Sequence, residues 1–244
     1  MEVASRLLSE LFPSRCILCS QTVESSVENN AVEICRHCYN KQPFNAACCV
    51  QCALPLAEDS ANNTLCGRCI RKRPDYDYAH SIFRYEEDII GLVHQLKFSE
   101  KITYASSIGE LLLSAYDSAD VLKKEVPDCL LPVPLHPERL RQRGFNQSIE
   151  IARILSKKRS LPVELSSIVR RRSTPSQTGL SAKQRQTNIR GAFEFVSKMP
   201  YKHVLIIDDV VTTGSTVNEL ASLLKKNNIE RVGVLSIARA PVRN

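Results

Sequence analysis

The 244-residue sequence contains no tryptophan, two methionines and eight glycines, and only 6% of its residues are aromatic. So little glycine excludes a collagen-like chain, and a composition of 43% hydrophobic and 24% charged residues excludes a coiled coil or a disordered protein. The sequence also lacks a run of about 18 uncharged apolar residues, the length that a membrane-spanning helix requires. We therefore expect an ordinary globular protein without membrane insertion.

The first residues lack the apolar segment of a secretory signal peptide and carry two acidic side chains, Glu2 and Glu10. We therefore expect a cytoplasmic protein. In that compartment thiols stay reduced, and clustered cysteines are more often metal ligands than disulfides.

Cysteine is unevenly distributed along the chain. Nine of the ten cysteines lie between Cys16 and Cys69, and a basic stretch at residues 71–74 follows them at once. This change in composition predicts a small domain at residues 1–74 and a larger one at residues 75–244.

Eight of these cysteines form four pairs with two residues between the partners, a spacing that lets both thiolates bind one metal ion. The pairs are Cys16 and Cys19, Cys35 and Cys38, Cys49 and Cys52, and Cys66 and Cys69. Two pairs complete a closed four-thiolate site with no open position for catalysis, so the sequence predicts two structural zinc ions. Sequential pairing is the simplest arrangement. An interleaved pairing, and Cys48 in place of Cys49, are the alternatives.

Beyond the cysteine-rich segment, strand-like and helix-like patterns alternate along the chain. Strands are predicted at residues 79–85, 129–135, 163–170, 192–196, 204–207 and 232–238. Helices are predicted at residues 88–96, 102–116, 147–157 and 216–227, with a short amphipathic helix before Pro13. This alternation indicates an α/β fold with a mainly parallel sheet flanked by helices.

The most specific pattern lies at residues 203–217, where an apolar strand precedes two carboxylates and a hydroxyl-rich turn. Ligands of α/β sheets bind beyond the carboxyl ends of the strands. Backbone N–H groups of the turn and the start of the next helix form a cradle for a monophosphate, which Gly214 lets the backbone approach. Asp208 and Asp209 suit hydroxyl groups beside that phosphate, as a ribose presents them. The Walker and dinucleotide-binding glycine patterns are absent.

The positive charge is concentrated in one segment, because residues 139–190 hold 13 Lys and Arg side chains against Glu150 and Glu164. A single bound phosphate ligand does not require so many cations, so single-stranded DNA is a second candidate ligand. The candidate DNA-binding residues are Arg139, Arg141, Arg143, Arg170, Arg171, Arg172 and Lys183. The alternatives are binding of the phosphate ligand alone and a solvated basic face.

Residues 204–216 resemble the 5-phosphoribosyl 1-pyrophosphate (PRPP) motif of type I phosphoribosyltransferases. Nearly the whole chain is similar to the ComF family, competence-associated proteins with a phosphoribosyltransferase-like domain. The segments that carry this resemblance are CVQCALP at 49–55, HQLKF at 94–98, PVPL at 132–135, RGFNQS at 143–148 and TPSQTGLSAKQRQTN at 174–188. The resemblance implies a type I phosphoribosyltransferase-like domain after a double zinc-ribbon module.

By this resemblance, Asp208 and Asp209 would bind the ribose hydroxyls, near the positive charge that develops on the ribose during transfer. Pro134 and Leu135 would meet the pyrophosphate, with Mg²⁺ bridging pyrophosphate and ribose oxygens. A mobile loop at about residues 170–190 would close over the site and bring Arg185 and Gln177 to the anionic ligand, Arg185 in a catalytic role. The remaining PRPP-binding residues would be Val210, Thr212, Thr213, Gly214, Ser215 and Thr216, chiefly at the 5′-phosphate.

The resemblance also implies a role in natural transformation, in which internalised single-stranded DNA would be received with a helicase and recombination proteins. The alternative is a metabolic phosphoribosyltransferase that transfers ribose 5-phosphate from PRPP to an unidentified acceptor and has no DNA role. Neither a base-recognition pocket nor a general base for an acceptor is recognisable in the sequence, so the sequence leaves enzymatic turnover open.

Overall fold

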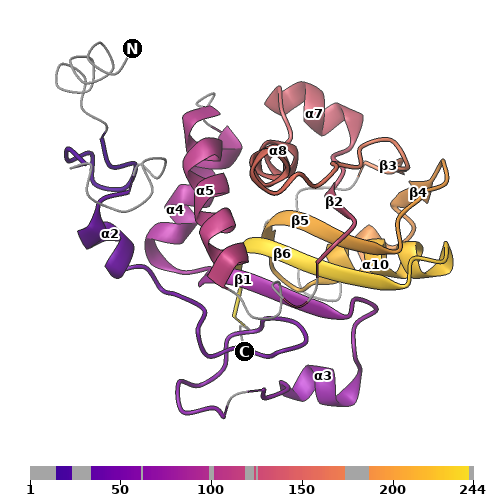
Figure 1. Ribbon diagram of the computed structural model, residues 1–244, viewed down its shortest axis with the longest axis horizontal. Helices are drawn as coiled ribbons and strands as arrows, with labels where there is room; N and C mark the ends of the chain where they lie inside the picture. Colours follow the sequence, from indigo (N-terminus) through magenta and orange to yellow (C-terminus); the bar gives the residue numbers. More distant parts are fainter. Residues whose placement is uncertain are drawn as a thin grey trace.

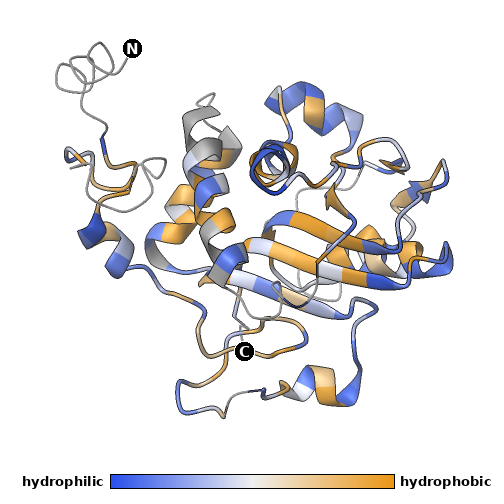
Figure 2. Cartoon of the chain, viewed as in Figure 1, coloured by the Kyte–Doolittle hydropathy of each residue, from blue (hydrophilic) through white to orange (hydrophobic). Residues whose placement is uncertain are grey.

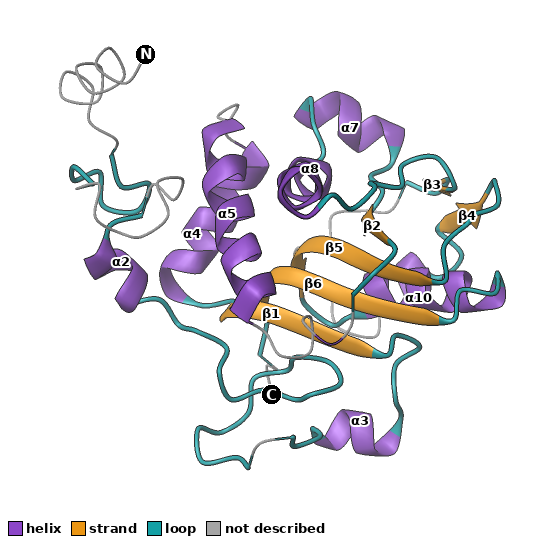
Figure 3. Cartoon of the chain, in the orientation of Figure 1, coloured by secondary structure: helices purple, strands orange, loops and turns teal. Residues whose placement is uncertain are grey.

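A four-stranded parallel sheet forms the centre of the computed structural model (Figure 1). Its strands, in the spatial order β1-β6-β5-β2, are β1 (Tyr78–Arg84), β6 (Arg231–Arg239), β5 (His203–Val211) and β2 (Cys129–Pro132). All three pairings are parallel, which confirms the prediction of a mainly parallel sheet. A separate antiparallel pair is formed by β3 (Ile168–Arg170) and β4 (Phe193–Phe195) (Figure 3).

The structure describes most of the chain but not all of it. The described residues are 15–23, 34–61, 63–98, 102–118, 124, 126–173 and 187–241. The short helix predicted before Pro13 lies outside them. Among the helices within these ranges, none combines the length and the apolar character needed to cross a bilayer.

Helices cover both faces of the central sheet. The helices within the described ranges are α2 (Arg36–Asn40), α3 (Gly67–Arg71), α4 (Glu87–Phe98), α5 (Ile102–Ser118), α7 (Pro137–Arg143), α8 (Gln147–Arg159) and α10 (Ser215–Lys226). Of these, α2 and α3 belong to the cysteine-rich segment and lie away from the sheet (Figure 1). In β5, Val204 and Ile206 pack in the core that α10 covers, whereas Leu205 and Ile207 pack in the core that α4, α5 and α8 cover. Successive side chains of a strand point to opposite faces. Burial on both faces therefore explains the continuous apolar run of β5 (Figure 2).

The helix α7 was not predicted from the sequence, although its ends carry recognisable signals. His136 precedes it, and the side chain of His136 accepts a hydrogen bond from the backbone N–H of Glu138. Pro137 occupies the first helical position, where its missing N–H costs nothing. Gly144 ends the helix in the left-handed conformation, with φ of 77°. Helix α7 is only seven residues long, too short for a helical period to show in the sequence.

Three strands differ in length from the prediction by three residues or more. The strand β5 continues to Val211, because its pairing with β6 extends through Val211 and Arg239. Asp208 and Asp209 therefore lie within the strand, not beyond it. The strands predicted at residues 129–135 and 163–170 are shorter, since β2 ends at Pro132 and β3 begins at Ile168.

Gly109 allows the close packing of α5 on α8, and its replacement by alanine is expected to destabilise the fold. A Cβ atom on Gly109 would lie 2.3 Å from Cδ1 and 2.9 Å from Cβ of Ile154 on α8. The Cβ of Ile154 cannot move without its helix, so we expect Gly109→Ala to lower the free energy of unfolding by about 1–3 kcal/mol.

Gly91→Ala is the matched control for this prediction, because Gly91 also lies within a helix and a Cβ there meets nothing within 4 Å. This variant is expected to be as stable as the wild type or more stable by up to about 1 kcal/mol, since alanine favours the helix. Denaturant unfolding followed by circular dichroism measures both. Equal stability of the two variants would contradict close packing at Gly109.

Candidate functional site

The hydroxyl-rich turn after β5 lies where the strand meets α10. Gly214 precedes the helix in the left-handed conformation, with φ of 81°, which favours glycine at this position. The hydroxyls of Thr213 and Ser215 lie 2.8 Å apart, and Thr213 Oγ1 also accepts a hydrogen bond from the backbone N–H of Ser215. Residues 212–216 are all half-buried, so the turn stays accessible to a ligand. This geometry is that of an anion cradle at a helix N-terminus.

The two carboxylates before the turn are held by the backbone of their own strand. Asp208 Oδ1 accepts a hydrogen bond from the N–H of Asp209 at 2.9 Å, and Asp209 Oδ1 accepts one from the N–H of Val210 at 2.7 Å. Both side chains are half-buried. Each carboxylate is therefore oriented by one oxygen while the group remains accessible from one side.

Two motifs that are separate in the sequence meet beside the end of β5. The N–H of Val133 donates to the carbonyl of Ile207 at 3.0 Å, which holds the PVPL turn against β5. Asn146 Nδ2 donates to the carbonyl of Val133 at 3.0 Å, and Asn146 Oδ1 caps α8 by accepting from the N–H of Ser148. Pro134 and Leu135, both half-buried, follow in this turn. Asn146 was not selected from the sequence, although an asparagine before a helical segment is a typical N-cap signal.

Three of the candidate DNA-binding arginines, Arg143, Arg139 and Arg170, interact electrostatically with one another in this order, and Arg170 also interacts with Asp208. Burial and the charge of Arg139 lower the pKa of Arg170 to about 10, while Asp208 opposes this shift. Burial and the charge of Arg143 lower the pKa of Arg139, and Glu138 opposes that shift. The guanidinium of Arg170 also lies 5.6 Å from the ring centre of Phe193. Like charges gathered beside a carboxylate favour an anionic ligand there.

The other candidate DNA-binding residues lie farther out. Arg171 is exposed and forms an ion pair with Glu194 at 2.6 Å. Arg172 is exposed and donates to the carbonyls of Asn188 and Arg190. Arg141 is exposed on α7, and Arg170, by contrast, is only 7% exposed. The basic segment therefore divides into an inner group beside Asp208 and an outer group on the surface.

Residues 174–186 of the predicted mobile loop lie outside the described residues, and with them Gln177, Lys183 and Arg185. Both flanks are described. Ser173 Oγ donates to Glu138 on α7 at 2.9 Å, and the N–H of Gly191 donates to Glu219 on α10 at 2.6 Å. The described residues on either side of this gap thus bond to α7 and α10, the helices that follow the PVPL turn and the hydroxyl-rich turn.

Arg239, the last residue of β6, donates hydrogen bonds to the hydroxyl-rich turn after β5 and was not selected from the sequence. It is 2% exposed. Its Nη1 donates to the carbonyls of Val211 at 2.9 Å, Thr212, and Ala240 at 3.1 Å. Its Nε donates to the carbonyl of Cys52 at 3.0 Å. The available signal was a single arginine directly after an apolar strand.

The cysteines form two clusters, each with four Sγ atoms within 4.8 Å of one another. The first contains Cys16, Cys19, Cys35 and Cys38, and the second contains Cys49, Cys52, Cys66 and Cys69. The sequential pairing is confirmed and the interleaved alternative is wrong. Cys48 belongs to neither cluster; it forms a β-bridge with Pro55.

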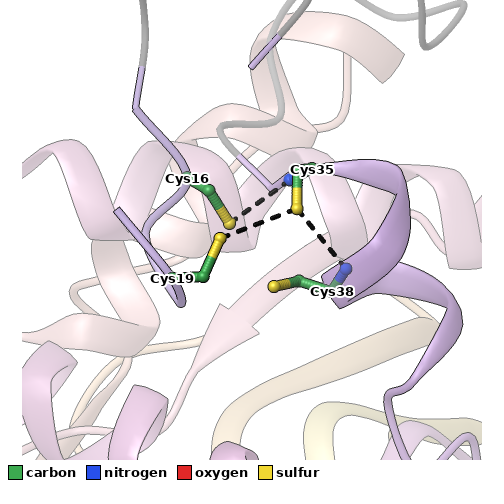
Figure 4. A group of neighbouring side chains, drawn as sticks. All are labelled: Cys16, Cys19, Cys35 and Cys38. Atoms are coloured by element: carbon green, nitrogen blue, oxygen red, sulfur yellow. Dashed lines mark hydrogen bonds between the residues drawn. The ribbon is translucent and has the colours of Figure 1, made fainter. Parts of the chain in front are cut away.

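The first cluster has the geometry of a four-thiolate zinc site (Figure 4). The Sγ atoms of Cys19 and Cys35 lie 3.8 Å apart, close to the roughly 3.8 Å expected for a tetrahedron with zinc–sulfur bonds of about 2.3 Å. The N–H of Cys35 donates to Cys16 Sγ at 3.3 Å, and the N–H of Cys38 donates to Cys35 Sγ at 3.4 Å. Such bonds stabilise thiolates, so the residues fit zinc.

The second cluster fits zinc equally well and is buried. Its Cys52 and Cys66 sulfurs lie 3.7 Å apart, and the N–H of Cys66 donates to Cys49 Sγ at 3.3 Å. Burial would raise the pKa of Cys49, but backbone N–H groups, that of Cys66 first, lower it to about 7. All four cysteines are part of the core under α10, whereas Cys19 of the first cluster is exposed and Cys35 and Cys38 are half-buried.

Family models match two parts of the chain. A double zinc ribbon domain matches residues 7–70, and a phosphoribosyl transferase domain matches residues 145–244. Among solved structures, the chain is similar to the allosteric regulatory enzyme of purine biosynthesis, with 17% identity and a TM-score of 0.39. That alignment covers 59% of this chain, which spans only 30% of the enzyme's chain.

Curated relatives match nearly the whole chain. The DNA utilization protein YhgH of Escherichia coli K12 is 35% identical over 84% of this chain and 90% of its own. Competence protein F of Haemophilus influenzae is 34% identical over 96% of this chain and 100% of its own. Competence protein ComFC of Streptococcus pneumoniae is 23% identical over 92% of this chain and 100% of its own.

Proposed function

The chain belongs to the ComF/YhgH family, and we propose on this basis that it binds PRPP with Mg²⁺ at the end of β5 and handles single-stranded DNA during natural transformation. The phosphoribosyl transferase domain supports the first part of this proposal. The names of the relatives, a DNA utilization protein and a competence protein, support the second.

One observation supports the ligand site above all others: three segments far apart in the sequence meet around Asp208. They are the end of β5, the stretch that contains the PVPL turn and Arg139 of α7, and the buried Arg170 of β3. Placing Arg170 and Arg139 close together costs electrostatic free energy in the absence of an anion. A pyrophosphate group between them and the ribose hydroxyls would offset this cost.

In the proposed complex, each part of the site has a separate task. The turn at residues 212–216 holds the 5′-phosphate through backbone N–H groups and hydroxyls. Asp208 and Asp209 accept hydrogen bonds from ribose hydroxyls, and the inner arginines orient the pyrophosphate. The oxygen ligands at the end of β5 fit Mg²⁺, which would neutralise part of the pyrophosphate charge. The two carboxylates would also stabilise positive charge that develops on the ribose if transfer occurs.

The outer arginines are the proposed contacts to DNA, since they are exposed and border the same site. Replacing Arg141, Arg171 and Arg172 together with alanine is expected to flatten the slope of log affinity for single-stranded DNA against log salt by about 2, because each phosphate contact contributes about 0.7. The PRPP affinity of this triple variant should stay within about twofold of the wild type.

Arg139→Ala should have the opposite effects: it should leave the salt dependence of single-stranded DNA binding unchanged and weaken PRPP binding by about tenfold. A tenfold loss corresponds to one charge-assisted hydrogen bond.

The matched control replaces Lys157, Lys158 and Arg159 together with alanine. This triple variant loses the same charge from the C-terminus of α8, where Lys158 pairs with Glu110 and Arg159 with Asp117. It should change neither the affinity for single-stranded DNA nor the affinity for PRPP.

An unchanged salt slope in the outer-arginine variant would exclude the proposed DNA contacts. Absence of PRPP binding at millimolar concentration would exclude the ligand site. Consumption of PRPP with an acceptor in a protein that does not bind DNA would favour the metabolic alternative.

A further inference from the structure

Arg239 is a buried cation whose four described hydrogen bonds all go to backbone carbonyls of two functional regions. Three of these carbonyls belong to Val211, the last residue of β5, and to Thr212 and Ala240, which directly follow β5 and β6. The fourth belongs to Cys52, a cysteine of the second cluster. One guanidinium therefore joins the phosphate-binding turn to a metal ligand that is far away in the sequence.

The bonds to Val211 and Thr212 determine the direction of the turn's N–H groups. In a trans peptide the C=O of one residue and the N–H of the next point in opposite directions. Because the carbonyls of Val211 and Thr212 point to Arg239, the N–H groups of Thr212 and Thr213 point away from it. They are thereby directed to the opposite side of the turn, where an anion is held by N–H groups.

The second cysteine cluster is also linked to the turn through Gln51 and Tyr76. Gln51, between Cys49 and Cys52, donates from Nε2 to the carbonyls of Tyr76 at 2.7 Å and Asp77 at 3.0 Å. Tyr76 is 4% exposed, and its hydroxyl lies 3.7 Å from the position of a Cβ on Gly214. The loop at residues 49–52 is thus bonded to Arg239 through the Cys52 carbonyl. Through Gln51 it also holds Tyr76, whose hydroxyl lies close to Gly214.

Charge favours the same connection. A zinc ion bound by four thiolates carries a net negative charge, and Arg239 is a cation bonded directly to the backbone of one ligand. Bound zinc would hold this guanidinium more firmly through the Cys52 carbonyl, and with it the carbonyls of the turn. A phosphate on the far side of the turn is attracted to the same positive charge.

We propose that Arg239 is a positioning residue that couples the second zinc site to the ribose-phosphate turn, so that zinc and a ribose phosphate stabilise each other's binding. The inference rests on the proposed function, because that supplies the ligand of the turn. Coupling between two sites is reciprocal, so the ligand must strengthen zinc binding by the same factor by which zinc strengthens ligand binding. The first cluster provides an internal reference, because its Cys16 packs in the opposite core, with α4 and α5.

The test measures zinc loss to an excess of chelator from the zinc-loaded full-length protein, with and without saturating ribose 5-phosphate. The phase belonging to the first site is the one that disappears in the Cys16→Ser/Cys19→Ser variant. We expect ribose 5-phosphate to slow zinc loss from the second site by at least about fivefold, a typical coupling, and to leave the first site unchanged.

Arg239→Lys tests the residue itself, and Arg231→Lys, at the exposed start of the same strand, is its matched control. Lysine keeps the charge but cannot bond several carbonyls in one plane. We expect Arg239→Lys to weaken ribose 5-phosphate binding about tenfold, the order of one charge-assisted hydrogen bond, and to abolish its effect on zinc loss. Arg231→Lys should preserve both. If Arg239→Lys fails to fold, the wild-type measurement alone decides whether coupling exists.

The possible failures are distinguishable. If ribose 5-phosphate binds the wild type but leaves zinc loss from the second site unchanged, the coupling is excluded and the proposed ligand site stands. If Arg239→Lys folds and keeps the protection, Arg239 is not the connection. If ribose 5-phosphate does not bind the zinc-loaded wild type at all, the proposed function fails, and the coupling fails with it.

Discussion

Cys52→Ser is expected to lower the melting temperature of the whole protein by about 8–16 °C, because it removes a ligand of the buried second zinc site. Cys52 is 5% exposed and lies in the same core as β5 and α10. We expect the free energy of unfolding to fall by about 4 kcal/mol, which is less than half of the roughly 10 kcal/mol or more that a structural zinc can contribute. For a chain of this size each kcal/mol lowers the melting temperature by about 2–4 °C, which gives the stated shift.

Cys19→Ser is the matched comparison, since it removes one ligand of the first cluster at an exposed position. We expect less than half of the effect, because the surroundings of Cys19 are already hydrated. Thermal unfolding followed by circular dichroism measures the shift, and metal analysis gives the zinc content. The wild type should hold two zinc ions per chain. A content below about 1.5 would contradict two closed sites. Equal shifts in both variants would contradict the larger contribution expected of the buried second site.

The second large effect is expected at the proposed ribose site. Replacing both Asp208 and Asp209 with asparagine should weaken PRPP binding by about 100-fold or more, because each charged hydrogen bond to a hydroxyl contributes about 1.5–3 kcal/mol. Asparagine suits this test since its Oδ1 can still accept the backbone N–H that each aspartate now binds. The fold should therefore be preserved while the charge is lost.

Asp128→Asn is the control for this variant. Asp128 also accepts backbone N–H groups, from Lys202 and His203, but at the amino-terminal end of β5. It should leave PRPP affinity unchanged. Isothermal titration calorimetry with Mg²⁺ present measures all three proteins. A double variant that binds PRPP as tightly as the wild type would show that the carboxylates do not contact the ribose.

Local patterns in the sequence were sufficient for the elements whose chemistry is local. Two residues between cysteines bring two thiolates close together, so the two groups of clustered cysteines were predicted correctly, with Cys49 rather than Cys48 in the second group. The apolar run of β5, followed by Gly214 and hydroxyl residues, likewise predicted a strand, a turn and a helix in the right order. In each case the residues that act together lie within a few positions of one another.

Contacts between distant residues were decided only by the tertiary structure. Periodicity reports which face of an element is buried but not what it is buried against. For this reason the sequence did not reveal that Arg170 and Arg139 lie beside Asp208 while Arg141 and Arg171 remain exposed. A single basic segment thus became an inner group and an outer group with different proposed ligands.

The same limit applies to the relation between the two halves of the chain. The sequence by itself determined a cysteine-rich module, a parallel α/β sheet and a hydroxyl-rich turn between a strand and a helix. Only the tertiary structure showed that the second cluster shares the core of the sheet and that Arg239 bonds both Cys52 and the turn. An arginine at the end of an apolar strand has no local partner that could reveal its role. Its bonds form only when β6 is placed beside β5 and the cysteine loop closes over both.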